Sequence, residues 1–251
     1  MTLNANPASL KFLPGARGRV LNPFILLMFA LALTGCAQTK VFKSNSAIQG
    51  RVDASVVLLV EPDVQLSLLT AAGLNEPHAE WTEIGKKNVF DALHALMKEK
   101  NASLIPYRQP QADPDKAHRH NQLMKMHQAV GVSILNHKYN QVLALPTKAD
   151  KFDWTLGPDA RLLKEEFGAD YALFIFLRDS YATAGRAAVI AVGAVLGVAV
   201  QGGRQVGFAS LVDLETGEVA WFNLLFNETG DLRTPEPARL AVDSLLTGVP
   251  L

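Results

Sequence analysis

The sequence predicts an α/β fold in which a mixed sheet is flanked by helices and followed by a C-terminal β-hairpin and a closing helix. Two short apolar runs bounded by chain breakers, "SVVLLVEP" and "YALFIFL", are typical of buried central strands. A helical repeat of apolar residues separates them, and strand–turn–strand sequence follows them. Helices alternating with strands and followed by a meander indicate a mixed sheet.

The first half of the domain predicts alternating strands and helices. Residues 63–70 alternate apolar and polar positions, as an extended segment does, and "AGLNEP" marks a turn. Apolar residues spaced by three and four from Trp81 to Met97 predict an amphipathic helix. In order along the chain we expect a strand at 55–62, an extended segment at 63–70, a helix at 78–100, a strand at 102–107 and a helix at 116–136.

The second half contains three recognisable end signals. Gly168 suits the left-handed position after a short helix at 159–167, and a strand follows at 171–177. Gly217 supplies the positive φ that the short loop of a hairpin at 206–226 needs. Thr234-Pro235-Glu236 predicts the start of a last helix, with Thr234 as its N-cap.

The N-terminus has the layout of a secretory signal. Lys11, Arg17 and Arg19 precede an apolar stretch at 20–33, which is shorter than the roughly 20 residues that span a bilayer. It ends in Leu33-Thr34-Gly35-Cys36, and Cys36 is the only cysteine. This ending resembles the lipobox of bacterial lipoproteins. An ordinary signal peptide with a chance cysteine, or an uncleaved anchor, is the alternative.

The lipobox resemblance implies cleavage before Cys36 and a lipid, such as palmitate, on its thiol. No disulfide within the chain is then expected, and no cofactor besides the lipid. In that family an Asp after the cysteine usually retains the protein in the inner membrane, so Ala37 implies the outer membrane. We therefore expect a signal peptide at 1–35, a lipid-proximal tether at 36–54 and a single periplasmic domain at 55–251.

Composition and motifs argue against several function classes. The formal net charge of +0 gives no basic field for nucleic acid. The six histidines are not spaced as metal ligands, and surface or partly buried histidines are expected. The chain has no nucleophile elbow and no phosphate-binding loop, so we expect it not to be an enzyme.

The segment "AAVIAVGAVLGVAVQGG", at 187–203, is apolar except for Gln201. Three interpretations stay open: a helix or hairpin packed on the sheet or between subunits, a contact with membrane or partner, and a pore element. Gly193 and Gly197 form a G-x-x-x-G pair that lets helices approach closely in a membrane. The candidate contact residues are Val189, Val192, Gly193, Val195, Leu196 and Gly197.

The order of elements, with "GADYALFIFL" and "ASLVDLETGEVAWF", resembles the amino-terminal domain of TolB and the curli secretion lipoprotein CsgG. The resemblance implies an anticodon-binding-like, TolB-N-like fold in the cell envelope, without shared catalytic residues. We therefore expect an outer-membrane-anchored lipoprotein on the periplasmic face, a non-enzymatic scaffold or assembly factor with protein partners or a homo-oligomer. The alternative is an oligomeric secretion-channel component that inserts 187–203 into the membrane.

Overall fold

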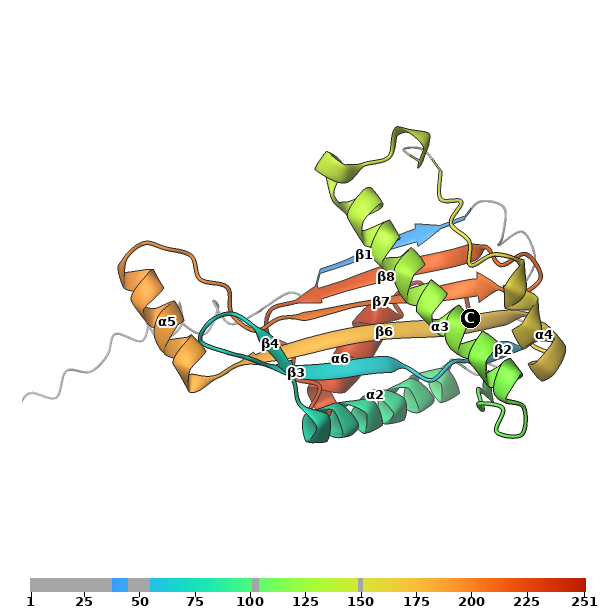
Figure 1. Cartoon of the computed structure of the whole chain (residues 1–251), viewed down its shortest axis with the longest axis horizontal. Coiled ribbons are helices and arrows are strands. Elements are labelled where there is room, and N and C mark those ends of the chain that lie inside the picture. The colour runs from blue at the N-terminus through green and yellow to red at the C-terminus, as the bar shows by residue number, and fades with distance from the viewer. Residues whose placement is uncertain (1–37, 45–54, 101–103, 149–150) are drawn as a thin grey trace, which may run out of the picture. The chain divides into compact units, whose positions relative to one another are not determined.

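The computed structural model describes residues 38–44, 55–100, 104–148 and 151–251, which belong to one compact unit, Cys36–Leu251. Within these residues the chain folds as an open mixed sheet of eight strands with helices on both faces (Figure 1). The predicted α/β class is therefore confirmed. Cys36 and the lipobox residues Leu33, Thr34 and Gly35 lie outside the described residues, so the lipidation site stays a prediction.

The sheet combines an antiparallel half with a parallel half. The neighbours β1, β8, β7 and β6 run antiparallel, whereas β6, β2 and β5 run parallel. In the order of the sheet these strands are β1 (Gln38–Lys43), β8 (Val219–Asn227), β7 (Gln205–Asp213), β6 (Tyr171–Ala182), β2 (Val57–Leu59) and β5 (Leu104–Pro106).

Strand β6 is long enough to pair with two successive strands on the same side. Its first residues pair with β2, and its second half pairs in parallel with β3 (Asp63–Leu69). The strand is interrupted between β2 and β3 at Glu61 and Pro62, because proline has no N–H to donate to the hydrogen-bond ladder of the sheet. The short strand β4 (Asn75–Pro77) folds back antiparallel on the end of β3.

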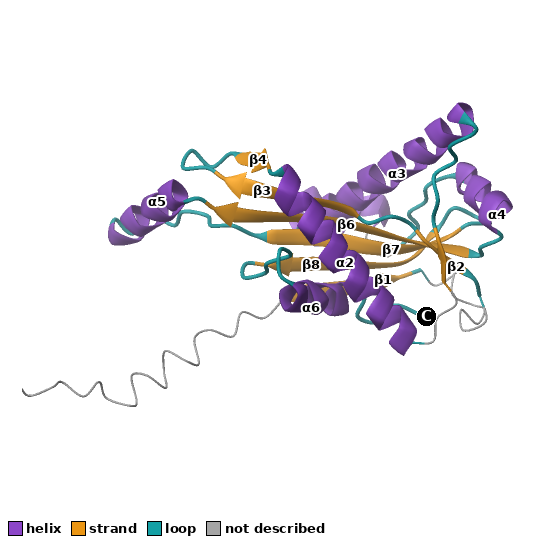
Figure 2. Cartoon of the chain, turned by 90° about the horizontal axis from the view of Figure 1, so that it is seen from below, coloured by secondary structure: helices purple, strands orange, loops and turns teal. Residues whose placement is uncertain are grey.

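The helices cover the two faces of the sheet. Helices α2 (Ala79–Glu99) and α6 (Pro235–Leu245) pack together on the face that Figure 2 views. Helices α3 (Pro114–Ile134) and α4 (Arg161–Phe167) cover the opposite face. Alternate residues of β6 face the two sides, so Leu173 and Ile175 join the first core and Ala172 and Phe174 the second.

Several local predictions are confirmed. The helix expected at 78–100 is present as α2, and His78 caps it, its Nδ1 accepting a hydrogen bond from the Trp81 N–H at 3.3 Å. Gly168 and Gly217 adopt φ values of 65° and 76° at the predicted helix end and hairpin turn. Thr234 occupies the N-cap position of α6, but its hydroxyl donates to the Asp231 carbonyl and makes no side-chain cap.

Several boundaries differ from the prediction: the strand expected at 55–62 is confined to Val57–Leu59, and three other differences have a structural reason. Residues 38–43 of the expected tether form the edge strand β1, while 45–54 lie outside the described residues. Strand β1 is held because Val41 packs on the α2–α6 core and the Phe42 ring stacks on Phe152 at 5.6 Å. Strand β6 extends five residues beyond the predicted end, because its second half gains β3 as a partner. Helix α3 begins at Pro114, since Asp113 accepts from the Lys116 N–H at 2.9 Å.

Candidate interaction site

The connection between β6 and β7 is an apolar arm, residues 184–204, that lies beyond the end of the sheet (Figure 1). It consists of helix α5 (Ala184–Val195) and an extended return segment, so the segment 187–203 is a helix followed by a loop and not a β-hairpin. Thr183 caps the helix, its Oγ1 accepting from the Arg186 N–H at 3.2 Å.

Internal contacts hold the arm in one conformation. The guanidinium of Arg186 donates to the Gln201 carbonyl from Nε at 2.9 Å and from Nη2 at 2.7 Å. Gly193 faces the return segment so closely that a Cβ there would lie 2.6 Å from Val200 Cγ2. Gly197 turns the chain with a φ of 71°. The two glycines of the G-x-x-x-G pair therefore shape the arm itself, and Gly193 is not free to contact a second helix.

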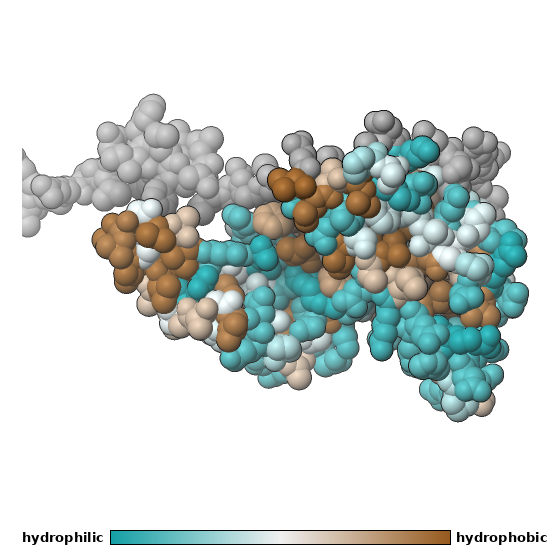
Figure 3. Space-filling view, turned by 45° about the horizontal axis from the view of Figure 1, so that its top comes forward, coloured by the Kyte–Doolittle hydropathy of each residue, from teal (hydrophilic) through white to brown (hydrophobic). Residues whose placement is uncertain are grey.

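The other four predicted contact residues point into solvent. The side chains of Val195 and Leu196 are 86% and 72% exposed, and Val192 is 59% exposed. Val189 is 39% exposed, and Val198 on the return segment adds a further exposed side chain. Figure 3 shows the resulting hydrophobic surface over α5. Such a contiguous exposed apolar surface marks contact with protein or membrane.

A network of buried polar groups fixes the strands from which the arm departs. One oxygen of the Asp179 carboxyl in β6 accepts from Tyr181 Oη at 2.6 Å, Gln205 Nε2 at 3.2 Å and the Leu232 N–H at 3.1 Å. Burial raises the pKa of Asp179. The Arg233 guanidinium lies 3.7 Å from the Tyr181 ring centroid. The arm is therefore mounted on a rigid end of the sheet.

No helix within the described part of the chain is long and apolar enough to cross a membrane. Helix α5 itself has 12 residues, about 18 Å at 1.5 Å per residue. The same described residues contain no group of three or more His, Cys, Asp or Glu side chains placed to hold a metal ion.

Two histidines of α3 are more buried than the sequence suggested. His127 is 5% exposed, and its Nε2 lies 2.5 Å from Ser210 Oγ of β7. Burial lowers the pKa of His127 to about 3. His120 is fully buried between Tyr107 and Glu166, each 3.2 Å from one ring nitrogen. Ser210 is 1% exposed, so this serine–histidine pair is enclosed between α3 and β7 and joins the two elements.

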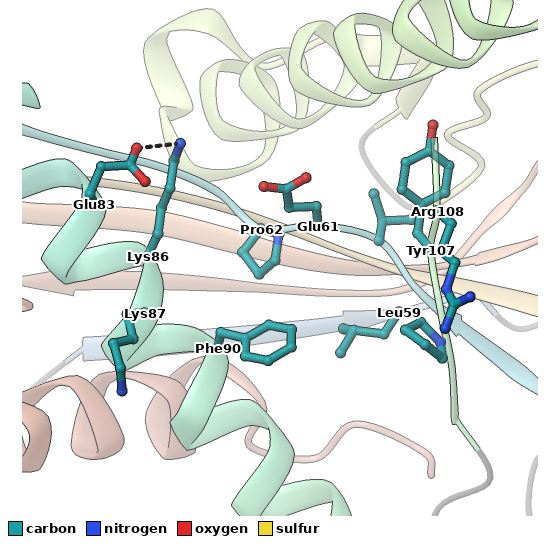
Figure 4. Close-up of a pocket in the computed structure, with 11 residues that line it drawn as sticks. Leu59, Glu61, Pro62, Glu83, Lys86, Lys87, Phe90, Tyr107 and Arg108 are labelled. Atoms are coloured by element: carbon teal, nitrogen blue, oxygen red, sulfur yellow. Dashed lines mark hydrogen bonds and ion pairs between the residues drawn. The ribbon is translucent and has the colours of Figure 1, made fainter. Parts of the chain in front are cut away.

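A cavity of about 530 Å³ lies outside the carboxyl ends of β2 and β5, beside α2. Ligands of open α/β sheets bind in this position, where the chain leaves neighbouring parallel strands for opposite faces. Glu61 and Arg108 follow the two strands, and Phe90 of α2 lies across from them (Figure 4). Lys86 at the rim is paired with Glu83 of its own helix at 3.0 Å. The cavity therefore offers charged groups and an aromatic surface.

The sequence did not reveal this cavity, because its walls come from three elements far apart in the chain. A usable signal was present: Glu61 stands near the end of the strand predicted at 55–62, and Arg108 follows the strand predicted at 102–107. The carboxyl ends of parallel strands meet at one edge of a sheet.

Comparisons with known proteins assign neither a family nor a function. No family model and no curated protein matches the chain. Two solved structures of a PelC dodecamer from Paraburkholderia phytofirmans are similar to it. The first, a single-residue variant of PelC, has 14% identity and a TM-score of 0.35, covering 86% of this chain and 98% of its own. The second PelC structure has 13% identity and a TM-score of 0.31, covering 84% and 96%.

The LpoB C-terminal domain from Salmonella enterica is a further structural neighbour, with 17% identity and a TM-score of 0.24, covering 70% of this chain and 84% of its own. TM-scores this low carry no functional inference. The resemblance to CsgG and TolB that the sequence suggested stays a prediction.

Proposed function

We propose that this chain is a non-enzymatic lipoprotein of the outer membrane that acts as a scaffold or assembly factor on the periplasmic face. The apolar arm is the observation that carries the proposal. It is an exposed element held by internal hydrogen bonds, and its apolar side chains can be buried by a binding partner or a membrane but carry no reactive group. Fully burying one Val or Leu side chain stabilises a contact by about 1.5–3 kcal/mol, so the exposed side chains of the arm supply several kcal/mol.

The start of the fold supports a position close to the membrane. Strand β1 begins at Gln38, two residues after Cys36. Two extended residues reach about 7 Å, so a lipid on Cys36 would hold the edge of the sheet near the headgroups. This differs from the long tether that the sequence predicted. A lipoprotein with more than one acyl chain stays on the membrane stably.

Cell fractionation combined with in-cell cross-linking tests the proposal. We expect the wild-type chain in the outer-membrane fraction and, after cross-linking, in a discrete complex larger than the chain itself. Cys36→Ser should lose both properties, whereas Thr34→Ala, which keeps a small residue before the cysteine, should retain them. A wild-type chain found in the soluble fraction, or running as a free monomer after cross-linking, would overturn the proposal.

A further inference from the structure

We propose that the apolar arm inserts into one leaflet of the membrane that carries the lipid anchor, so that the chain contacts this membrane at two points. The inference rests on the proposed lipidation of Cys36 and names the component that covers the arm. Two membrane contacts hold a domain in one orientation relative to the bilayer, whereas a single flexible lipid anchor allows the domain to rotate. A fixed orientation suits a scaffold.

The distribution of apolar side chains around the arm indicates lipid. A protein partner covers one face of a helix, and the remaining face is then polar. In α5 every position from Ala187 to Val195 is apolar, and only Ile190 and Gly193 are shielded, by the return segment. Leu196 and Val198 continue the exposed apolar surface past the helix end. An apolar surface on all sides suits surroundings that are apolar on all sides.

Most backbone carbonyls at the tip of the arm are hydrogen-bonded within the arm. A water-free environment requires this, because each unsatisfied polar group costs several kcal/mol there. The end of α5 would ordinarily leave four carbonyls without partners. Three of these carbonyls accept hydrogen bonds: Val192 from the Leu196 N–H at 3.1 Å, Gly193 from Val198 at 2.8 Å and Ala194 from Gly197 at 3.3 Å.

The length and the charges of the arm agree with insertion to the depth of one leaflet. Helix α5 measures about 18 Å, against a hydrocarbon core of about 30 Å for a whole bilayer. Arg186 and Arg204 stand at its base, where their positive charges suit the headgroup region of a membrane with anionic lipids. The Arg186 guanidinium stays bonded to the Gln201 and Ala71 carbonyls, so its contribution to the membrane contact is its charge. The turn between β3 and β4 lies next to this base, because Arg186 Nη1 donates to the Ala71 carbonyl of that turn at 3.4 Å. Leu74 in the same turn is 64% exposed and adds a further apolar side chain.

The strand register places Gln38, two residues after the proposed lipid attachment point, at the same end of the sheet as the arm. Gln38 pairs with Phe226 of β8, and Phe226 pairs with Val206 of β7. Val206 lies two residues after Arg204, where the arm rejoins the sheet. Figure 1 shows β1 and β7 starting at the end beyond which α5 lies. Because Cys36 is within about 7 Å of Gln38 along the chain, the lipid and the arm are directed to one surface.

A depth-resolved fluorescence measurement tests the inference. In Val195→Cys, lipidation of Cys36 leaves position 195 as the only free thiol, which takes a nitrobenzoxadiazole label. The matched control is Val142→Cys, because Val142 is 91% exposed, outside the arm. Both labelled lipoproteins are reconstituted into phosphatidylethanolamine–phosphatidylglycerol vesicles that contain acyl-chain spin labels.

We expect the spin labels to quench the label at 195 several-fold more than at 142, and aqueous iodide to show the reverse order. Equal iodide quenching at the two positions would overturn the inference. So would a protection at 195 that disappears as the protein is diluted into lipid, because that result identifies a second copy as the cover. Two labels per chain would show that the Cys36 thiol is free, so that lipidation has failed while insertion of the arm is still to be decided. The same quenching comparison in a Cys36→Ser background then decides whether the arm inserts.

Discussion

Gly131 of α3 is a position where a single methyl group should destabilise the fold. The helix crosses β7 there so closely that a Cβ would lie 2.1 Å from Cε2 and 2.3 Å from Cζ of Phe208. The Phe208 ring is fully buried and stacks between Phe176 at 4.8 Å and Phe222 at 5.5 Å. The ring has no room to turn away, so Gly131→Ala must push α3 off the sheet.

The opposing contributions fix the expected sign. In an open helix, alanine is more favourable than glycine by about 1 kcal/mol. Overpacking a tight core costs about 1–3 kcal/mol. Lifting α3 also weakens the His127–Ser210 hydrogen bond, with a further cost of about 0.5–1.5 kcal/mol. We therefore expect a net loss of about 1–3 kcal/mol, which lowers the melting temperature by about 2–12 °C in a domain of this size.

Thermal and urea unfolding of the wild type and Gly131→Ala measure this loss. The control is Gly202→Ala in the return segment of the arm, where the nearest atom to a new Cβ, Ile190 Cδ1, is 3.8 Å away, so the stability should change little. In a Phe208→Leu background the same Gly131→Ala change should cost less, because the smaller side chain relieves the clash. A Gly131→Ala protein as stable as the wild type would refute the packing of α3 on Phe208.

Three further predictions concern charge and exposure. Asp179→Asn should stabilise the protein at neutral pH: burial raises the pKa of Asp179, so the contribution of this carboxyl to folding stability is greatest below 3.8 and is lost as the pH rises through the raised pKa, whereas asparagine stays neutral. Unfolding curves at several pH values would contradict this if the variant kept the wild-type pH dependence. His127 should stay neutral in NMR titration well below pH 6.5, and the protein should lose stability as the pH falls from 6.5 toward about 3, because only the unfolded chain takes up the proton readily; a His127 titration near 6.5 would contradict its burial. Val195→Asp should leave the melting temperature within about 2 °C of the wild type, because the side chain is 86% exposed; a large drop measured by calorimetry would show that the arm packs within the fold.

Local signals in the sequence predicted most of the central sheet and its helices. Val57 and Leu173 are buried on adjacent strands, as the apolar runs indicated. Gly168 and Gly217 adopt the predicted positive φ because glycine, which has no Cβ, adopts that conformation at the least steric cost. These features depend on a few residues that are neighbours in the sequence, so the spacing of apolar residues and the position of a glycine are enough to predict them.

The features that the sequence did not predict depend on distant partners. Strand β1 looks like a polar tether until β8 is known to lie beside it, since an edge strand needs few buried side chains. His127 is buried because α3 crosses the sheet at Ser210, 83 positions further along the chain. Of the candidate contact residues, Val192 and Val195 are exposed as expected, but Gly193 packs on its own return segment, a contact that no local pattern encodes.

The intact mass of the protein purified from membranes tests the central claim most directly, because the proposed location of the chain depends on the lipid on Cys36. The account predicts a chain that begins at Cys36 and carries additional mass equal to attached acyl chains, and Cys36→Ser should abolish that added mass. A chain that retains residues 1–35, or one that is cleaved but carries no lipid, would contradict the account.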